Sequence, residues 1–137
     1  NHPAFGFISG WFYSDIAGIR PEWERAGFEH FEIKPHLMGD LKEAKASVDT
    51  VRGKVSSHWT RDDSGVTLEV TIPANSSAAV WVPKGGRADV TITESGRAVW
   101  QGGAFAPAPG LSSAKDAGRW VKFEAGSGSY AFRLTGK

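Results

Sequence analysis

Hydrophobic and polar residues alternate along most of the chain after Pro21. The clearest example is the segment from Val66 to Ile72, in which valine, leucine and isoleucine occupy every second position and threonine or glutamate the positions between. A period of two residues is typical of a β-strand that turns one face to a core and the other to solvent. Residues that favour turns separate these segments, as in the run from Asp62 to Gly65.

This pattern predicts eight or nine short strands. The expected strands cover residues 28–34, 41–50, 54–61, 66–72, 78–82, 88–93, 98–101, 119–125 and 129–135. Short strands at near-regular spacing are typical of an antiparallel β-sandwich or a jelly roll, so we expect an all-β, jelly-roll-like fold. Residues 102–118, which are rich in Ala, Pro, Gly and Ser, should form a long loop. The last two strands should pair as a hairpin across residues 126–128.

Residues 1–20 differ from the rest and predict one N-terminal α-helix. Pro3 suits a first helical turn, and Gly18 suits a helix end. The apolar side chains are spread around the helix, which is typical of a helix buried on nearly all sides. One sheet covers only one of these sides. We therefore expect a terminal helix over 1–20, a β-sandwich domain over 21–137, and a missing partner on the N-terminal side.

Composition narrows the classes of partner. The chain has 137 residues, 40% of them hydrophobic and 23% charged, as expected of one globular domain. Sixteen basic and 15 acidic residues give a net charge of +1, so we expect neither nucleic acid nor an anionic membrane as partner. The chain has no cysteine, which excludes disulfides and thiolate chemistry. Nothing in the sequence assigns a cellular compartment.

The acidic residues do not form a recognisable catalytic pair. An inverting glycosidase needs two carboxyl groups that face each other across the bond. Here Asp62 and Asp63 share a turn, and Glu69 and Glu124 fall on solvent-facing strand positions. We expect surface carboxylates and no catalytic residue in this chain.

The histidines and glycines give no cofactor motif either. His30, His36 and His58 lie on separate predicted elements, whereas zinc needs converging ligands, so we expect no metal site. The glycines are spaced as in turns and not as in phosphate-binding loops, so we expect no cofactor.

Several segments, in their order along the chain, carry a resemblance to a known family. They are Asn1–Ile19, Gly27–Pro35, Ala46–Val55, Ile72–Pro83 and Gly126–Phe132. Together they resemble the last helix of the catalytic barrel and the C-terminal β-sandwich of bacterial α-L-rhamnosidases, glycoside hydrolase family seventy-eight. The resemblance implies that this chain is a non-catalytic accessory domain and inactive alone. Its partner would be a missing N-terminal helical catalytic domain, in a parent that hydrolyses terminal α-L-rhamnose from glycosides with inversion.

The same resemblance gives His2 a role. In that family the histidine of the matching Asn-His contacts rhamnose, and the general acid and base lie upstream. His2 would then bind substrate only in the full-length parent. The alternative is a frayed terminal residue. A helix without its partner is also expected to favour dimerisation of the fragment.

Trp81 and Trp120 fall on the strand positions opposite to the core. Exposed tryptophans are unfavourable unless something covers them, so we expect one or both to dock against the catalytic domain or the linker helix. The first alternative is an autonomous carbohydrate-binding module, in which the two rings form a platform for a saccharide. A purely structural or adhesive sandwich is the third class, and it requires neither contact.

Overall fold

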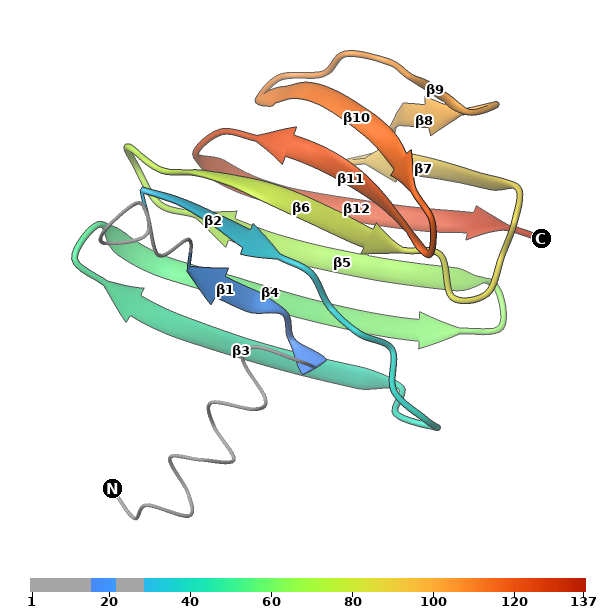
Figure 1. The fold of residues 1–137 in the computed structure, drawn as a ribbon, viewed down its shortest axis with the longest axis horizontal. Coiled ribbons are helices and arrows are strands. Elements are labelled where there is room, and N and C mark those ends of the chain that lie inside the picture. Colours follow the sequence, from blue (N-terminus) through green and yellow to red (C-terminus); the bar gives the residue numbers. More distant parts are fainter. Residues whose placement is uncertain (1–15, 22–28) are drawn as a thin grey trace.

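The computed structural model describes residues 16–21 and 29–137. Within these residues twelve strands form a five-stranded and a seven-stranded sheet, which pack face to face (Figure 1). The strands are β1 (Ile19–Pro21), β2 (His30–Ile33), β3 (Glu43–Thr50), β4 (Gly53–Asp62), β5 (Gly65–Ile72), β6 (Ser77–Pro83), β7 (Val90–Glu94), β8 (Arg97–Gln101), β9 (Ala104–Phe105), β10 (Leu111–Ala117), β11 (Trp120–Ala125) and β12 (Gly128–Gly136).

The five-stranded sheet has the order β1-β2-β6-β11-β10, and the seven-stranded sheet has the order β3-β4-β5-β12-β7-β8-β9. Neighbouring strands are antiparallel except β2 and β6, which run parallel. The expected all-β sandwich is therefore confirmed. No helix in the described part of the chain is long and apolar enough to cross a membrane.

The core lies between the two sheets and follows the alternation in the sequence. On β5 the burial pattern is that of the prediction, with Val66, Leu68, Val70 and Ile72 buried and Glu69 exposed. The largest fully buried side chains of both sheets meet in one cluster. They include Phe31, Ile33 and Phe123 of the five-stranded sheet and Trp59, Leu68, Phe132 and Leu134 of the seven-stranded sheet.

The loop predicted over residues 102–118 is wrong in part, because β9 and β10 lie there. β10 is the outer strand of the five-stranded sheet, and it pairs only with β11 within the described residues. Leu111 is its one buried residue, so the sequence of β10 lacks the alternation that marks a half-buried strand.

The predicted final hairpin is also wrong, because β11 and β12 belong to different sheets. β11 pairs with β6 and β10, whereas β12 pairs with β5 and β7. The turn between them crosses the core, and Phe123 meets Phe132 with ring centroids 5.0 Å apart. Two alternating strands joined by a glycine-rich turn look the same in sequence whether they pair or face each other.

The sandwich begins earlier than residue 21. Residues 1–15, which carry most of the predicted helix, lie outside the described residues. Residues 19 and 20 were assigned to that helix, but they belong to strand β1, which pairs with β2. Ile16 and Ile19 are buried in the sandwich core, 6% and 3% exposed. The sandwich therefore covers these two apolar side chains itself.

Candidate functional site

Residues 16–21, here called the entry segment, are held by the opposite sheet as well as by their own. The Trp59 indole N–H donates a hydrogen bond of 2.9 Å to the carbonyl oxygen of Ile16. The Ser57 hydroxyl donates one of 2.8 Å to the carbonyl oxygen of Ala17. Both donors come from β4 and both bonds are buried, so water does not compete for them.

The backbone of the connection after β2 holds the entry segment from another side. Lys34 N–H donates to Gly18 O at 2.8 Å, and His36 N–H donates to Ile16 O at 3.3 Å. Gly18 has φ +84°, and a Cβ there would lie 2.2 Å from the carbonyl carbon of Lys34. Only glycine fits this backbone contact.

The sequence alone did not identify Ser57 and Trp59 as the residues that hold the entry segment. A signal was present, because Ser57 occupies a core position of β4 between Val55 and Trp59. A buried hydroxyl in a strand needs a hydrogen-bond partner. The sequence did not reveal that this partner is the backbone forty residues upstream.

The structure brings Trp81 and Trp120 together. They lie on β6 and β11, which are neighbours in the five-stranded sheet, and their ring centroids are 6.1 Å apart at an interplanar angle of 88°. The residues next to them, Val80, Val82 and Val121, are fully buried in the core. Both tryptophans are therefore half-buried on the outer face of this sheet, as the alternation predicts.

Lysine side chains cover these two rings. Lys34 Nζ lies 4.0 Å from the ring centroid of Trp81 and 4.4 Å from that of Trp120. Lys122 Nζ lies 5.1 Å from the Trp81 ring. The Trp120 indole N–H donates to Pro35 O at 3.0 Å, whereas the buried Trp81 indole N–H has no partner among the described residues. Trp81 is thus the more enclosed of the two.

A cleft of about 580 Å³ opens beside Trp120, and we call it the basic cleft. The loop after β2, the loop after β6, the turn between β10 and β11, and Arg61 of β4 form its walls. Its charged or titratable lining residues are His36, Arg61, Lys84, Arg87 and Arg119. Of the described residues that line it, none is acidic.

Lys84 ties two walls of this cleft together. It is only 8% exposed, and its Nζ donates to Asp116 Oδ2 at 2.9 Å. This hydrogen bond from Lys84, together with one from the Gly118 N–H, lowers the pKa of the Asp116 carboxyl. The walls carried by the loop after β6 and by the β10–β11 turn are therefore fixed to each other.

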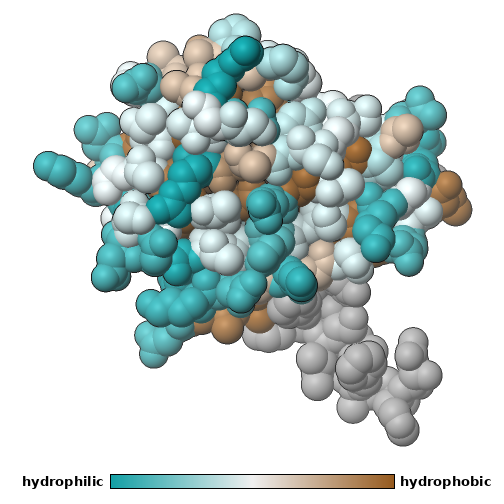
Figure 2. All heavy atoms as spheres, turned by 180° about the vertical axis from the view of Figure 1, so that it is seen from behind, coloured by the Kyte–Doolittle hydropathy of each residue, from teal (hydrophilic) through white to brown (hydrophobic). Residues whose placement is uncertain are grey.

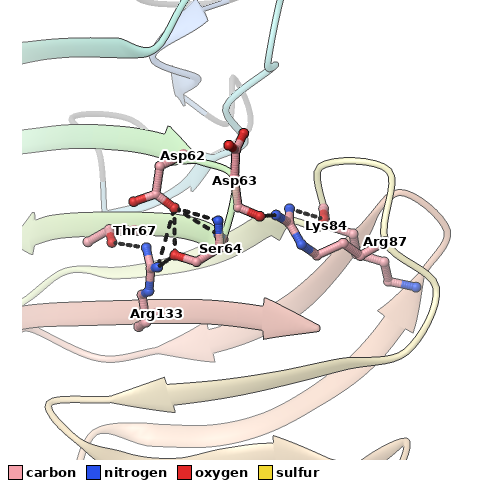
Figure 3. A network of polar contacts seen from close by, with 8 residues as sticks. Asp62, Asp63, Ser64, Thr67, Lys84, Arg87 and Arg133 are labelled. Carbon is pink, nitrogen blue, oxygen red and sulfur yellow. Dashed lines mark hydrogen bonds and ion pairs between the residues drawn. The ribbon is translucent and has the colours of Figure 1, made fainter. Parts of the chain in front are cut away.

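Asp62 closes the turn between β4 and β5 (Figure 3). Its Oδ1 accepts hydrogen bonds from the Ser64 hydroxyl at 2.7 Å, the Ser64 N–H at 2.9 Å and the Gly65 N–H at 3.0 Å. These bonds, with a smaller contribution from Arg133, lower the pKa of Asp62 to about 2. The predicted surface carboxylate is exposed and organises a turn.

Other carboxylates pair with basic groups on the sheet faces. His58 lies between Glu43, at 2.6 Å, and Glu69, at 3.4 Å, and His30 lies 3.4 Å from Glu124. Among the described residues no group of three metal-ligating side chains is arranged to hold a metal ion. His2, the substrate contact implied by resemblance, lies outside the described residues.

Fold and sites together define a two-sheet β-sandwich domain with an anchored entry segment. The family model of the bacterial alpha-L-rhamnosidase C-terminal domain matches residues 18–97, and the chain belongs to this family. An alpha-L-rhamnosidase of Streptomyces avermitilis is 37% identical over 83 residues, or 61% of this chain and 8% of the relative. One of Formosa agariphila is 29% identical over 133 residues, or 97% of this chain and 13% of the relative.

Solved structures of such enzymes contain the same fold. The alpha-L-rhamnosidase from Dictyoglumus thermophilum matches 98% of this chain with a TM-score of 0.79 and 29% identity. The Streptomyces avermitilis enzyme, solved with L-rhamnose, matches 97% with a TM-score of 0.69 and 32% identity. This chain spans 14% and 11% of those two chains, so in these relatives the domain is a small part of a larger chain.

Proposed function

We propose that this domain is the non-catalytic C-terminal accessory domain of an α-L-rhamnosidase and that its task is to fix the polypeptide ahead of it. Family membership and the small share of each relative that the domain covers support this role. The parent would hydrolyse terminal α-L-rhamnose from glycosides, and its helical catalytic domain would be the main partner.

The observation that carries the proposal is the anchoring of the entry segment. The carbonyl groups of Ile16 and Ala17 accept buried hydrogen bonds from Trp59 and Ser57, and Ala17 is fully buried. Residues 16–19 are the end of the segment, Asn1–Ile19, that resembles the last helix of the catalytic barrel. A rigid attachment at that point would orient the helix and hold His2 in the sugar pocket. Such positioning matters because small displacements of a pocket group lower the rate strongly.

The test uses the full-length parent with Trp59→Phe, which keeps an aromatic ring and removes the N–H donor. We expect kcat/KM for a chromogenic rhamnoside to fall about tenfold, because the entry segment loses one of its two side-chain anchors. The matched control is Trp100→Phe, since Trp100 is also buried but does not contact the entry segment through a hydrogen bond.

Equal losses in both variants would contradict the anchoring role. Hydrolysis of the rhamnoside by the 137-residue chain alone would contradict the non-catalytic role. We also expect this chain to dimerise through residues 1–20 when the catalytic domain is absent, which size-exclusion chromatography with light scattering measures.

A second candidate function is saccharide binding by the domain itself. The two tryptophans, which we otherwise expect to dock against the catalytic domain, lie together on one outer face, and Trp120 also lines the basic cleft. Lys34 covers both rings, so a neutral sugar would have to displace an ammonium group to stack on them. This arrangement favours the cleft over the open face as the place for a saccharide.

A further inference from the structure

Three arginines of the basic cleft, Arg61, Arg87 and Arg119, form no ion pair with a described carboxylate, although Asp40, Asp62 and Asp63 line an adjoining hollow that Arg61 and Arg87 share. Arg61 donates hydrogen bonds to the carbonyl oxygens of Gly39 and Leu41. Such carbonyl partners fix the guanidinium group in place and leave its charge in the cleft. Lys84 is different, because Asp116 neutralises it at 2.9 Å.

Arg87, like Arg61, donates its hydrogen bonds to backbone carbonyl groups. It donates to Asp63 O at 3.0 Å and to Lys84 O at 3.4 Å. Figure 3 shows Arg87 facing the backbone carbonyl of Asp63, while the Asp63 carboxylate points away from it. The third guanidinium, that of Arg119, is exposed and forms no ion pair with a described carboxylate.

Two walls of the cleft are tied together by the ion pair between Lys84 and Asp116. Gly85 has φ +63°, and a Cβ there would lie 2.9 Å from Arg87 Nη1, so a larger residue would displace the guanidinium. Across the cleft, the Gly118 N–H donates to Asp116 Oδ1 at 3.0 Å. Preorganised donors bind more tightly because less freedom is lost on binding.

One wall is aromatic and the volume suits a small ligand. Trp120 is fixed by its bond to Pro35 O and by the edge of His36, whose ring centroid is 5.4 Å away. The cleft volume of about 580 Å³ falls in the range typical of small-molecule sites. Guanidinium groups recognise planar and tetrahedral oxyanions through paired N–H bonds.

We propose that the basic cleft binds an anionic saccharide unit. Its carboxylate or sulfate ester lies on Arg119, with Arg61 and Arg87 adding positive charge, and the sugar ring lies against Trp120. This inference deepens the second candidate function, saccharide binding, and is independent of the anchoring role of Trp59.

The experiment measures binding to the full-length protein by isothermal titration calorimetry. The probes are tetragalacturonic acid, a sulfated galactan tetrasaccharide and neutral galactotetraose. We expect at least one acidic probe to bind ten or more times more tightly than the neutral one, and binding to weaken with added salt. The tighter of the two acidic probes identifies carboxylate or sulfate as the preferred group.

Substitutions of single residues test whether the acidic saccharide binds in this cleft. Arg119→Gln removes one exposed charge and should weaken acidic binding about tenfold, while Arg119→Lys should restore part of it. Arg97→Gln is the matched control, because Arg97, the first residue of β8, is also exposed and does not line the cleft. All of these variants should leave rhamnoside hydrolysis unchanged.

Three results would overturn the proposal. The first is the absence of acidic binding, the second is equal binding of the neutral probe, and the third is an equal loss with Arg97→Gln. A docking surface for an acidic face of another domain would give a lower unfolding temperature with Arg119→Gln and no glycan binding. The accessory role is tested apart, since Trp59→Phe should change rhamnoside kinetics without changing acidic-glycan affinity.

Discussion

The two sheets share one core but present different outer faces. The outer face of the seven-stranded sheet carries half-buried short polar side chains such as Ser56, Thr67 and Thr93, with His58 paired to glutamates. Figure 2, seen from behind the view of Figure 1, shows a surface that is mostly hydrophilic or intermediate, with hydrophobic groups in small separate areas. The five-stranded sheet instead carries Trp81 and Trp120 under lysine side chains.

This difference leads us to expect different roles for the two faces. Short polar residues on the outer face of the seven-stranded sheet can be satisfied by water or by a neighbour, as Thr67 is by Arg133 at 2.9 Å. The other face carries half-buried tryptophans in contact with lysine ammonium groups, next to a cleft with three arginines that form no ion pair with a described carboxylate. We therefore expect substitutions on the five-stranded face to have larger effects than matched substitutions on the seven-stranded face.

The largest difference in the free energy of unfolding between the two faces should come from shortening one outer side chain on each sheet. We expect Trp81→Ala to lower the free energy of unfolding by about 2 kcal/mol, less than for a fully buried tryptophan because Trp81 is half-buried. Thr71→Ala on the seven-stranded face should change it by less than about 0.5 kcal/mol. Urea unfolding followed by circular dichroism measures both, and similar values would remove the distinction between the faces.

Removing one charge on each face should give a smaller contrast. Lys34→Met keeps the aliphatic stem and removes the ammonium group over both tryptophans, at an expected cost of about 1 kcal/mol. Glu43→Gln weakens the exposed pair with His58 at an expected cost of about 0.5 kcal/mol. The second cost should shrink in 0.5 M salt more than the first, because the glutamate pair is more exposed. The opposite order of salt sensitivity would contradict this reading of the two faces.

The smallest effect on stability should come from substitution of Asp62, at the end of the seven-stranded sheet. Its folded-state pKa is lowered to about 2 from 3.8, so the ionised form stabilises the fold above about pH 4, and this contribution is lost as the pH falls to about 2. Asp62→Asn should therefore lower the unfolding temperature at pH 6 and have a vanishing effect near pH 2. Asp63→Asn, in the same exposed turn, is the control. A difference from wild type that stays constant with pH would refute the assignment to Asp62.

Local alternation was enough to predict the strands with one buried face. β5 and the two tryptophan positions on β6 and β11 lie as predicted, since strand geometry fixes which side chains share a face. β10 was missed because an outer strand with one buried residue has no alternation to detect. Residues 19 and 20 were placed in a helix because apolar residues of a buried strand and of a buried helix look alike over a short stretch.

Prediction of the candidate site residues required the tertiary structure more than prediction of the strands did. The sequence marked Trp81 and Trp120 as unusual, because tryptophan on a solvent-facing strand position is conspicuous. It did not mark Trp59 as an anchor or Arg119 as a cleft residue. Trp59 finds its partner 43 positions away, and the cleft joins residues from four separate parts of the chain.

By itself, the sequence determined the fold class, most strands and the face of each side chain on them, because these depend on near neighbours in the chain. Only the tertiary structure decided which strands pair, that β11 and β12 face each other across the core, and that three arginines gather beside Trp120. The physical reason is that hydrogen bonding and packing between distant segments depend on chain reversals whose direction local residues do not specify.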